Sequence, residues 1–197
     1  MFDSATRTSN GGGRGELRDV RLMQFSGEPG SQKLLHAIEI TMKVNSLKLN
    51  WLDEPCKVDP VLAKNDFGTS MFKQKCLTLR SELFLQSNNK TTLKALEMLA
   101  SRKVTHDYNA LVLTYSRYGD FGQFLVVREY FFPSAYGLEN PKVAIANDSP
   151  WHPVRFAEVP QRKAFADAVF AYGEKTAPAF DLAYMRKDPP AVPAFKP

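Results

Sequence analysis

The chain has only two cysteines, Cys56 and Cys76, and no C-x-x-C pair. Structural zinc sites of the finger and ribbon types need closely spaced pairs of thiolate or imidazole ligands, so the sequence excludes that class. Both cysteines lie in apolar or mixed surroundings, and we expect reduced thiols in a reducing compartment. A disulfide between Cys56 and Cys76 is the alternative that the sequence leaves open.

Catalytic patterns are equally scarce. The three histidines lie in separate segments, and only His106 stands beside a carboxylate, that of Asp107. Neighbours along a strand point to opposite faces, so this pair cannot act as a dyad. The glycines at 11–15 lack the lysine and hydroxyl residue of a phosphate loop, and no zinc-protease or EF-hand pattern is present. We therefore expect no enzyme, no metal site, no cofactor and no small-molecule substrate.

Long apolar runs are also missing. No window approaches the roughly 18 apolar residues of a membrane-spanning helix, and the N-terminus lacks the apolar core of a secretory signal. We expect a protein without a transmembrane segment that is not secreted and resides in the cytoplasm or nucleus. The apolar fraction of 44% is sufficient for a hydrophobic core, and the formal charge of +5 favours acidic partners.

Hydrophobic alternation with a period of two predicts strands in what we interpret as a single domain, residues 17–176. Around 34–44, the side chains of Ile38 and its even-numbered neighbours form one face, and polar residues form the other. The same alternation predicts a half-buried strand within 71–86. Residues 104–133 predict a central β-hairpin, whose glycines permit the reversal of the chain.

Helix signals mark three further segments. Asp59 and Pro60 predict the start of a short helix, the basic segment at 89–103 predicts a second, and Pro160 begins a third that ends at Gly173. Strands and helices alternate without a repeated βαβ unit. The sequence therefore predicts an α+β fold, with a mostly antiparallel sheet and two or three helices packed on one face.

The two ends of the chain have the composition of tails. Residues 1–16 are rich in Ser, Thr, Asn and Gly and predict a flexible arm. Residues 177–197 predict a Pro-rich tail in an extended conformation. We expect the aromatic residues of this tail to supply subunit contacts; these are Phe180, Tyr184 and Phe195.

Basic residues in the arm, near the strand within 71–86 and in the basic helix are candidates for contact with nucleic acid or lipid headgroups. They are Arg7, Arg14, Lys73, Lys75, Lys90, Lys94, Arg102 and Lys103. The hairpin also carries aromatic residues close to Arg117 and Arg128. A sheet with exposed rings can stack bases, and we assign this role to Tyr118 and Phe121.

Two segments resemble the matrix proteins of rhabdoviruses. The strand IEITMKVNS at 38–46 is similar to the family's early strand, which shows the same alternation before a turn. The segment NDSPWHPVRFAEVPQRKAFADAVFAYGEK at 147–175 is similar to the family's closing segment, in which an acidic turn and a Trp precede a helix. Its matching residues are Trp151, Phe165, Ala168 and Gly173. The chain lacks the Lys-rich, Pro-Pro-x-Tyr arm that animal members often carry, so the resemblance does not extend to membrane attachment by a basic arm or to recruitment of budding factors.

This resemblance implies a viral structural protein of matrix type, present in the virion, that self-associates and bridges a nucleocapsid to a membrane. Its partners would be further copies of the chain, viral nucleoprotein or nucleic acid, and an anionic membrane surface. Two alternatives remain open. The protein could bind single-stranded nucleic acid through the aromatic hairpin, or it could be a capsid or phage accessory subunit.

Overall fold

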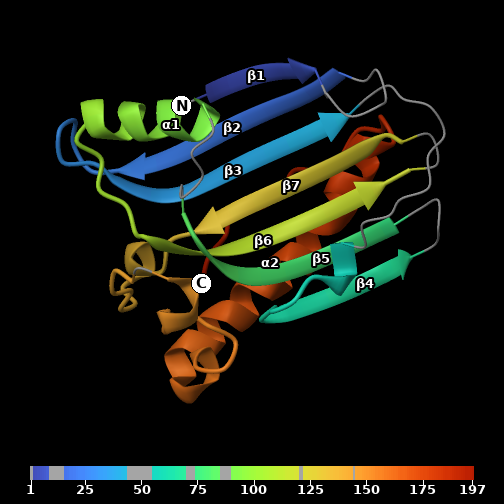
Figure 1. The fold of residues 1–197 in the computed structure, drawn as a ribbon. Helices are drawn as coiled ribbons and strands as arrows, with labels where there is room; N and C mark the ends of the chain where they lie inside the picture. The colour runs from blue at the N-terminus through green and yellow to red at the C-terminus, as the bar shows by residue number, and fades with distance from the viewer. Residues whose placement is uncertain are drawn as a thin grey trace.

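The computed structural model describes residues 2–8, 16–43, 55–69, 74–84, 90–119, 122–143 and 145–197. Its strands form one antiparallel sheet of seven strands, in the order β1-β2-β3-β7-β6-β5-β4 (Figure 1). The strands are β1 (Phe2–Thr8), β2 (Glu16–Ser26), β3 (Lys33–Lys43), β4 (Ala63–Thr69), β5 (Gln74–Leu83), β6 (Asn109–Tyr118) and β7 (Phe124–Phe131). The α+β class and the antiparallel sheet are therefore confirmed.

The predicted central hairpin is present and lies in the middle of the sheet. Strands β6 and β7 pair from Leu111 opposite Phe131 to Tyr118 opposite Phe124. Strand β5 adds to the outer edge of β6, and β3 adds to the outer edge of β7. Gly122 has a φ of 70°, in the left-handed region that favours glycine, which explains its place in the reversal.

One face of the sheet is covered by the long helix α2 (Pro160–Tyr184), which crosses behind the strands in Figure 1. Leu111, Leu113 and Tyr115 of β6 point to this side, where they pack with Phe165 and Val169 of α2. Burying a side chain of this size stabilises the fold by about 1.5–3 kcal/mol. The alternation that the sequence shows in β3, β5 and β6 thus builds the main core.

The other face is covered only in part. Ala110 and Val112 of β6 point to this side and pack with Ala95 and Leu99 of helix α1 (Lys90–Ser101). In Figure 1, α1 lies over one end of the strands, close to β1 and β2. Polar side chains occupy the same face farther along β5, β6 and β7, and neither α1 nor α2 covers this part.

The N-terminal arm is corrected in part. Residues Phe2–Thr8 form β1, which pairs with β2 from Phe2 opposite Leu22 to Thr8 opposite Glu16. Strand β2 is therefore an inner strand, paired with β1 on one side and β3 on the other. The sequence FDSATRT has no apolar alternation, so its composition did not predict this strand. The strand forms because its backbone groups pair with the free edge of β2. Arg14 lies outside the described residues.

The prediction of a short helix at Pro60 is wrong. Residues Pro55–Lys57 form one 3-10 turn, and the chain then enters β4, the outer strand beside β5. Asp59-Pro60 has the composition of a helix start, but pairing of the following residues with β5 prevails. The expectation of reduced thiols is also wrong: Cys56 and Cys76 form a disulfide with Cα atoms 5.6 Å apart. It ties the 3-10 turn to β5.

The final helix starts at Pro160 as predicted but continues past Gly173 to Tyr184, into the expected tail. Gly173 does not end the helix; it permits close packing, because a Cβ atom there would lie 2.7 Å from both methyl carbons of Leu113. Pro178 is exposed. Its ring removes the donor for the carbonyl of Glu174 on the solvent side, where water can replace it.

Asp181 holds the C-terminal half of α2 to the sheet. Its carboxylate accepts hydrogen bonds from Lys75 Nζ of β5 and Tyr115 Oη of β6, both at 3.0 Å, and lies 3.3 Å from Arg117 Nε. Burial by itself raises the pKa of this carboxyl, but the hydrogen bonds from Lys75 and Tyr115 and the charges of Lys75 and Arg117 outweigh burial and lower it.

Replacement of Asp181 by Asn is expected to reduce stability most at neutral pH. A lowered folded-state pKa means that the carboxylate stabilises the fold above its unfolded pKa and that this contribution disappears as the pH falls through the folded pKa. We expect Asp181→Asn to lower the free energy of unfolding by about 1.5–3 kcal/mol at pH 7 and by much less in strong acid. Urea unfolding across the acidic range measures the difference.

The matched control is Asp167→Asn, on the same helix. Among the described residues, Asp167 pairs with Lys163 alone, four residues away, and both side chains are largely exposed. A pair of this kind contributes about 0.3–0.5 kcal/mol. Equal losses for Asp167→Asn and Asp181→Asn, or a loss at Asp181 that does not change with pH, would contradict the role of Asp181 as a clamp.

Candidate binding surface on the open face of the sheet

The open face is the part of the sheet that neither helix covers, and it contains a hollow of about 520 Å³. Strands β5, β6 and β7 each contribute three alternating side chains, and the loop before β4 closes one edge. The lining residues are Pro55, Val58, Thr78, Arg80, Glu82, Thr114, Ser116, Tyr118, Val126, Arg128 and Tyr130. Most of these side chains are polar, in contrast to the apolar face under α2.

Two arginines project into this hollow from strands on either side of β6. Arg80 is paired in register with Val112, and Arg128 with Thr114, so their Cα atoms are about 12 Å apart. Arg80 Nη1 lies 3.4 Å from Glu82 Oε1. No described residue forms a salt bridge or side-chain hydrogen bond with Arg128, which is half-buried. The lining of the hollow therefore has two guanidinium groups for one carboxylate, and a second carboxylate, Glu39, is paired in register with Arg128 on the neighbouring strand β3.

Hydroxyl groups lie beside the two arginines; Thr114 is half-buried, whereas Thr78 and Ser116 are each only 5% exposed. Thr78, Thr114 and Arg128 stand side by side across β5, β6 and β7, and Ser116 follows on β6. A hydroxyl can donate one hydrogen bond to an anion. A guanidinium can donate two parallel hydrogen bonds to two oxygens of the same anion. This combination suits phosphate oxygens, which carry charge and accept several hydrogen bonds at once.

Aromatic rings border the hollow along β6 and β7. Tyr118, which the sequence predicted as a stacking residue, lies at one end, and its ring centroid is 6.0 Å from that of Phe124. Tyr130 lies farther along β7, where its hydroxyl donates to Glu39 at 3.3 Å. Burial, followed by the charge of Glu39, raises the pKa of Tyr130, so this side remains a neutral donor. Arg21, 3.0 Å from Glu39, completes that network.

The predicted basic residues whose side chains the structure describes are not gathered on this face. Lys75 and Arg117 point to the opposite side of the sheet, where both contact Asp181. Lys94, Arg102 and Lys103 belong to α1 and the turn that follows it, and all three are exposed. Strand β1 includes Arg7 and α1 begins at Lys90, but their side chains lie outside the described residues. Arg14, Lys73 and Phe121 lie entirely outside the described residues.

The rings assigned to subunit contacts lie against the chain itself. Phe180 is 5.8 Å from Tyr115 between ring centroids, and the guanidinium of Arg117 lies 5.5 Å from the ring centroid of Tyr184. Phe195 sits among the rings of Phe131, Tyr136, Phe165 and Tyr172, with centroid distances from 4.8 to 5.9 Å. The C-terminal segment therefore folds back onto the domain; self-association through these rings remains a prediction.

A second group of polar residues is buried under α2. Glu129 is 1% exposed, accepts a hydrogen bond from Tyr172 at 3.3 Å, and lies 3.2 Å from His36 Nε2. Burial, then the charge of Glu129, raises the pKa of the Tyr172 hydroxyl. Phe131 packs against His36 with ring centroids 4.7 Å apart and so shields the His36–Glu129 pair. The contacts of Glu129 therefore connect helix α2 and strand β3 to strand β7. Within the described ranges, no three His, Cys, Asp or Glu side chains gather as a metal site.

Sequence reasoning missed Arg80 and the hydroxyl row as parts of a site. The signal was present, because Arg80, Thr78 and Glu82 occupy the outward positions of a predicted strand. Which outward residues of separate strands stand together depends on strand order and register, and these follow from long-range pairing. Arg128 was noted beside the aromatic residues, but so was Arg117, which the structure places on the other face.

No family model, curated protein or solved structure matches the chain. None of the helices in the described part of the chain is long and apolar enough to cross a bilayer. The functional argument therefore depends on the chemistry of the surfaces themselves.

Proposed function

We propose that the protein is a matrix-type structural protein that holds single-stranded nucleic acid on the open face of its sheet. The observation that carries the proposal is the hollow where Arg80 and Arg128 flank the half-buried Thr114, with the buried Thr78 beside it on β5. Phosphate contacts supply most of the affinity of nucleic-acid binding, and guanidinium and hydroxyl groups are the usual donors.

The aromatic border supports single strands over duplexes. A base stacks on an aromatic ring only when it is free of its own partner, and Tyr118 lines the same hollow as Arg128 and Thr114. The open face is also a surface and not a closed cleft, which suits an extended polymer better than a small substrate. Binding of this kind requires no bond to be made or broken.

Self-association and attachment to a membrane complete the proposed role, in which copies bridge a nucleocapsid to an anionic bilayer. The resemblance of residues 38–46 and 147–175 to rhabdovirus matrix proteins supports this part, and so does the separation of polar and apolar chemistry onto opposite faces of the sheet. Sedimentation tests self-association, and flotation with anionic and neutral vesicles tests membrane binding. A monomeric profile with no enrichment on anionic vesicles would contradict it.

Replacement of the two arginines tests the nucleic-acid site. Arg128→Gln and Arg80→Gln keep polar side chains of similar length but remove one charge each. We expect each to weaken binding of a labelled single-stranded oligonucleotide about five- to tenfold, and to reduce the slope of log K against log salt by about 0.7. Fluorescence anisotropy over a salt series measures both effects.

The matched control is Arg155→Gln, because Arg155 is exposed and lies outside the open face. We expect wild-type affinity for it. Tyr118→Leu separates stacking from charge: it should weaken binding about tenfold while leaving the salt slope unchanged. Wild-type affinity in both arginine variants, or an equal loss in Arg155→Gln, would refute the open face as the binding site.

A further inference from the structure

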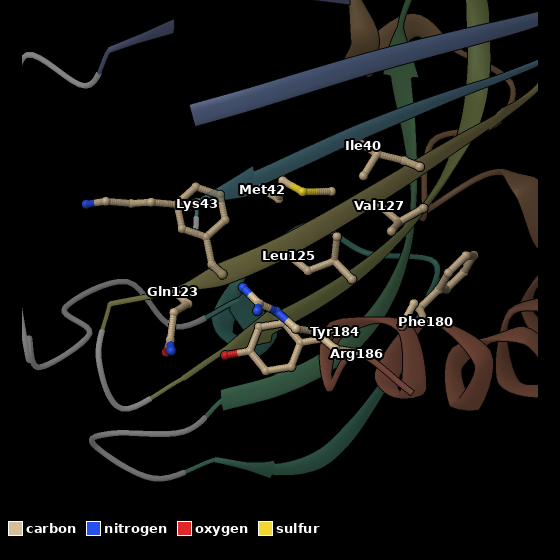
Figure 2. A pocket seen from close by; sticks show the side chains of 11 residues that line it. Ile40, Met42, Lys43, Gln123, Leu125, Val127, Phe180, Tyr184 and Arg186 are labelled. Atoms are coloured by element: carbon tan, nitrogen blue, oxygen red, sulfur yellow. The ribbon is translucent and has the colours of Figure 1, made fainter. Parts of the chain in front are cut away.

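An apolar groove of about 420 Å³ lies on the α2 side of the sheet, between the end of α2 and strands β3 and β7. Its floor consists of alternate side chains of the two strands, and α2 forms one wall (Figure 2). The apolar part of the lining includes Ile40, Met42, Leu125, Val127, Phe180 and Ala183. This volume is within the range of about 300–1,000 Å³ that is typical of small-molecule sites.

The groove exists because α2 is fixed toward β5 and β6. Asp181 binds Lys75 and Tyr115 on those strands, so the helix does not extend over the apolar row of β3. Ile40 and Met42 consequently remain half-buried, although they point to the same side as the main core. Binding of an apolar ligand over such a surface is favourable, because it removes apolar area from water.

The backbone around the groove determines what kind of molecule fits. Strands β3 and β7 are inner strands that pair with each other and with β2 and β6. Their N–H and C=O groups are already used, so an extended peptide laid over them would bury its own amides without partners at a cost of about 1–3 kcal/mol each. A hydrocarbon chain has no such groups. The groove therefore favours an acyl chain over a peptide strand.

The polar groups at the groove indicate which head group the ligand would carry. Figure 2 shows the side chains of Arg186 and Gln123 among the lining residues, close to Tyr184, whereas the Lys43 side chain is directed away from the groove. Arg186 follows the last turn of α2 and is exposed. A guanidinium at the end of an apolar groove is complementary to a carboxylate at the end of an acyl chain.

We propose that this groove binds a single-chain anionic amphiphile of the fatty-acid class, with its hydrocarbon chain along Ile40, Met42 and Phe180 and its carboxylate at Arg186. The inference goes beyond the proposed function and does not rest on it, because the groove and the open face lie on opposite sides of the sheet. Each site can therefore be present when the other is absent.

Dodecanoate and dodecanol, titrated below their aggregation limits, test the proposal by calorimetry. They share one chain length and differ in the charge of the head. We expect saturable binding of one dodecanoate per chain and binding of dodecanol about tenfold weaker, the equivalent of one charge-assisted contact. Arg186→Gln should remove most of this preference, while the control Lys187→Gln, at the next position, which is also exposed and does not line the groove, should retain it.

Ala183→Phe fills the groove without removing a core contact, because Ala183 is exposed. We expect it to weaken dodecanoate binding at least about tenfold while the unfolding transition stays in place. Absence of saturable dodecanoate binding to the wild-type chain, unchanged binding to Ala183→Phe, or equal affinity for dodecanoate and dodecanol would overturn the proposal. Arg128→Gln should bind dodecanoate normally and Arg186→Gln should bind oligonucleotide normally, so failure of one site is distinguishable from failure of the other.

Discussion

Trp151→Ala is expected to lower the free energy of unfolding by about 3–5 kcal/mol, the usual cost of truncating a fully buried large aromatic residue. Trp151 is 0% exposed and packs edge-on against Phe165 of α2, with ring centroids 5.9 Å apart. Its removal would leave a cavity between the irregular segment before α2 and the main core. Urea unfolding followed by far-UV circular dichroism measures the loss without depending on tryptophan emission.

Trp151→Phe is the matched control. The indole Nε1 has no hydrogen-bond partner in the described part of the chain, so replacement by Phe removes a buried donor that is not satisfied. Relief of that donor offsets part of the lost contact area, and we expect a loss below about 1.5 kcal/mol. A loss in Trp151→Ala of less than about 1 kcal/mol would contradict the placement of this ring in the core.

Gly173→Leu is expected to be the second severe substitution. Even the Cβ atom would lie 2.7 Å from both methyl carbons of Leu113, and Leu113 is itself only 2% exposed. Overpacking of a filled core costs about 1–3 kcal/mol, and the remaining atoms of Leu increase the overlap. We therefore expect loss of more than about 3 kcal/mol, or failure to fold, despite the gain of about 1 kcal/mol in helix propensity.

A graded series makes this prediction sharp. Gly173→Ala should cost about 1–3 kcal/mol, and combining it with Leu113→Val should recover part of the loss, because the shorter side chain withdraws from the helix. Chemical unfolding of the two single variants and the double variant measures the coupling. Additive losses, or stabilisation by Gly173→Ala alone, would show that α2 does not approach β6 as closely as the structure indicates.

These substitutions bear on function because packing in the core determines the positions of both candidate sites, the open face and the apolar groove. Close packing of α2 on β6 at Gly173, together with the Asp181 clamp, determines where the helix stops covering the sheet. That position opens the apolar groove on one side. On the other side, the short α1 covers one end of the strands and leaves the two half-buried arginines and Thr114 uncovered.

Local sequence signals predicted the elements whose side chains must alternate. Ile38, Ile40 and Met42 of β3 and Leu111 and Leu113 of β6 face the core as their spacing requires, because one face is buried and a shift of one residue would expose them all. Strand β1 has no such pattern and was not predicted. The end of α2 was predicted wrongly, because a glycine in a helix signals either a stop or a close approach.

The sequence by itself determined the class of fold: an antiparallel sheet with a central hairpin, helices beginning at Pro160 and near Lys90, and a mildly basic chain without catalytic motifs. Only the tertiary structure decided which arginines share a surface. Arg117 and Arg128 both flank aromatic residues in the hairpin, yet strand register sends one to Asp181 under α2 and the other to the open face. Side-chain direction follows from local periodicity, but neighbours across a sheet depend on pairings between distant segments.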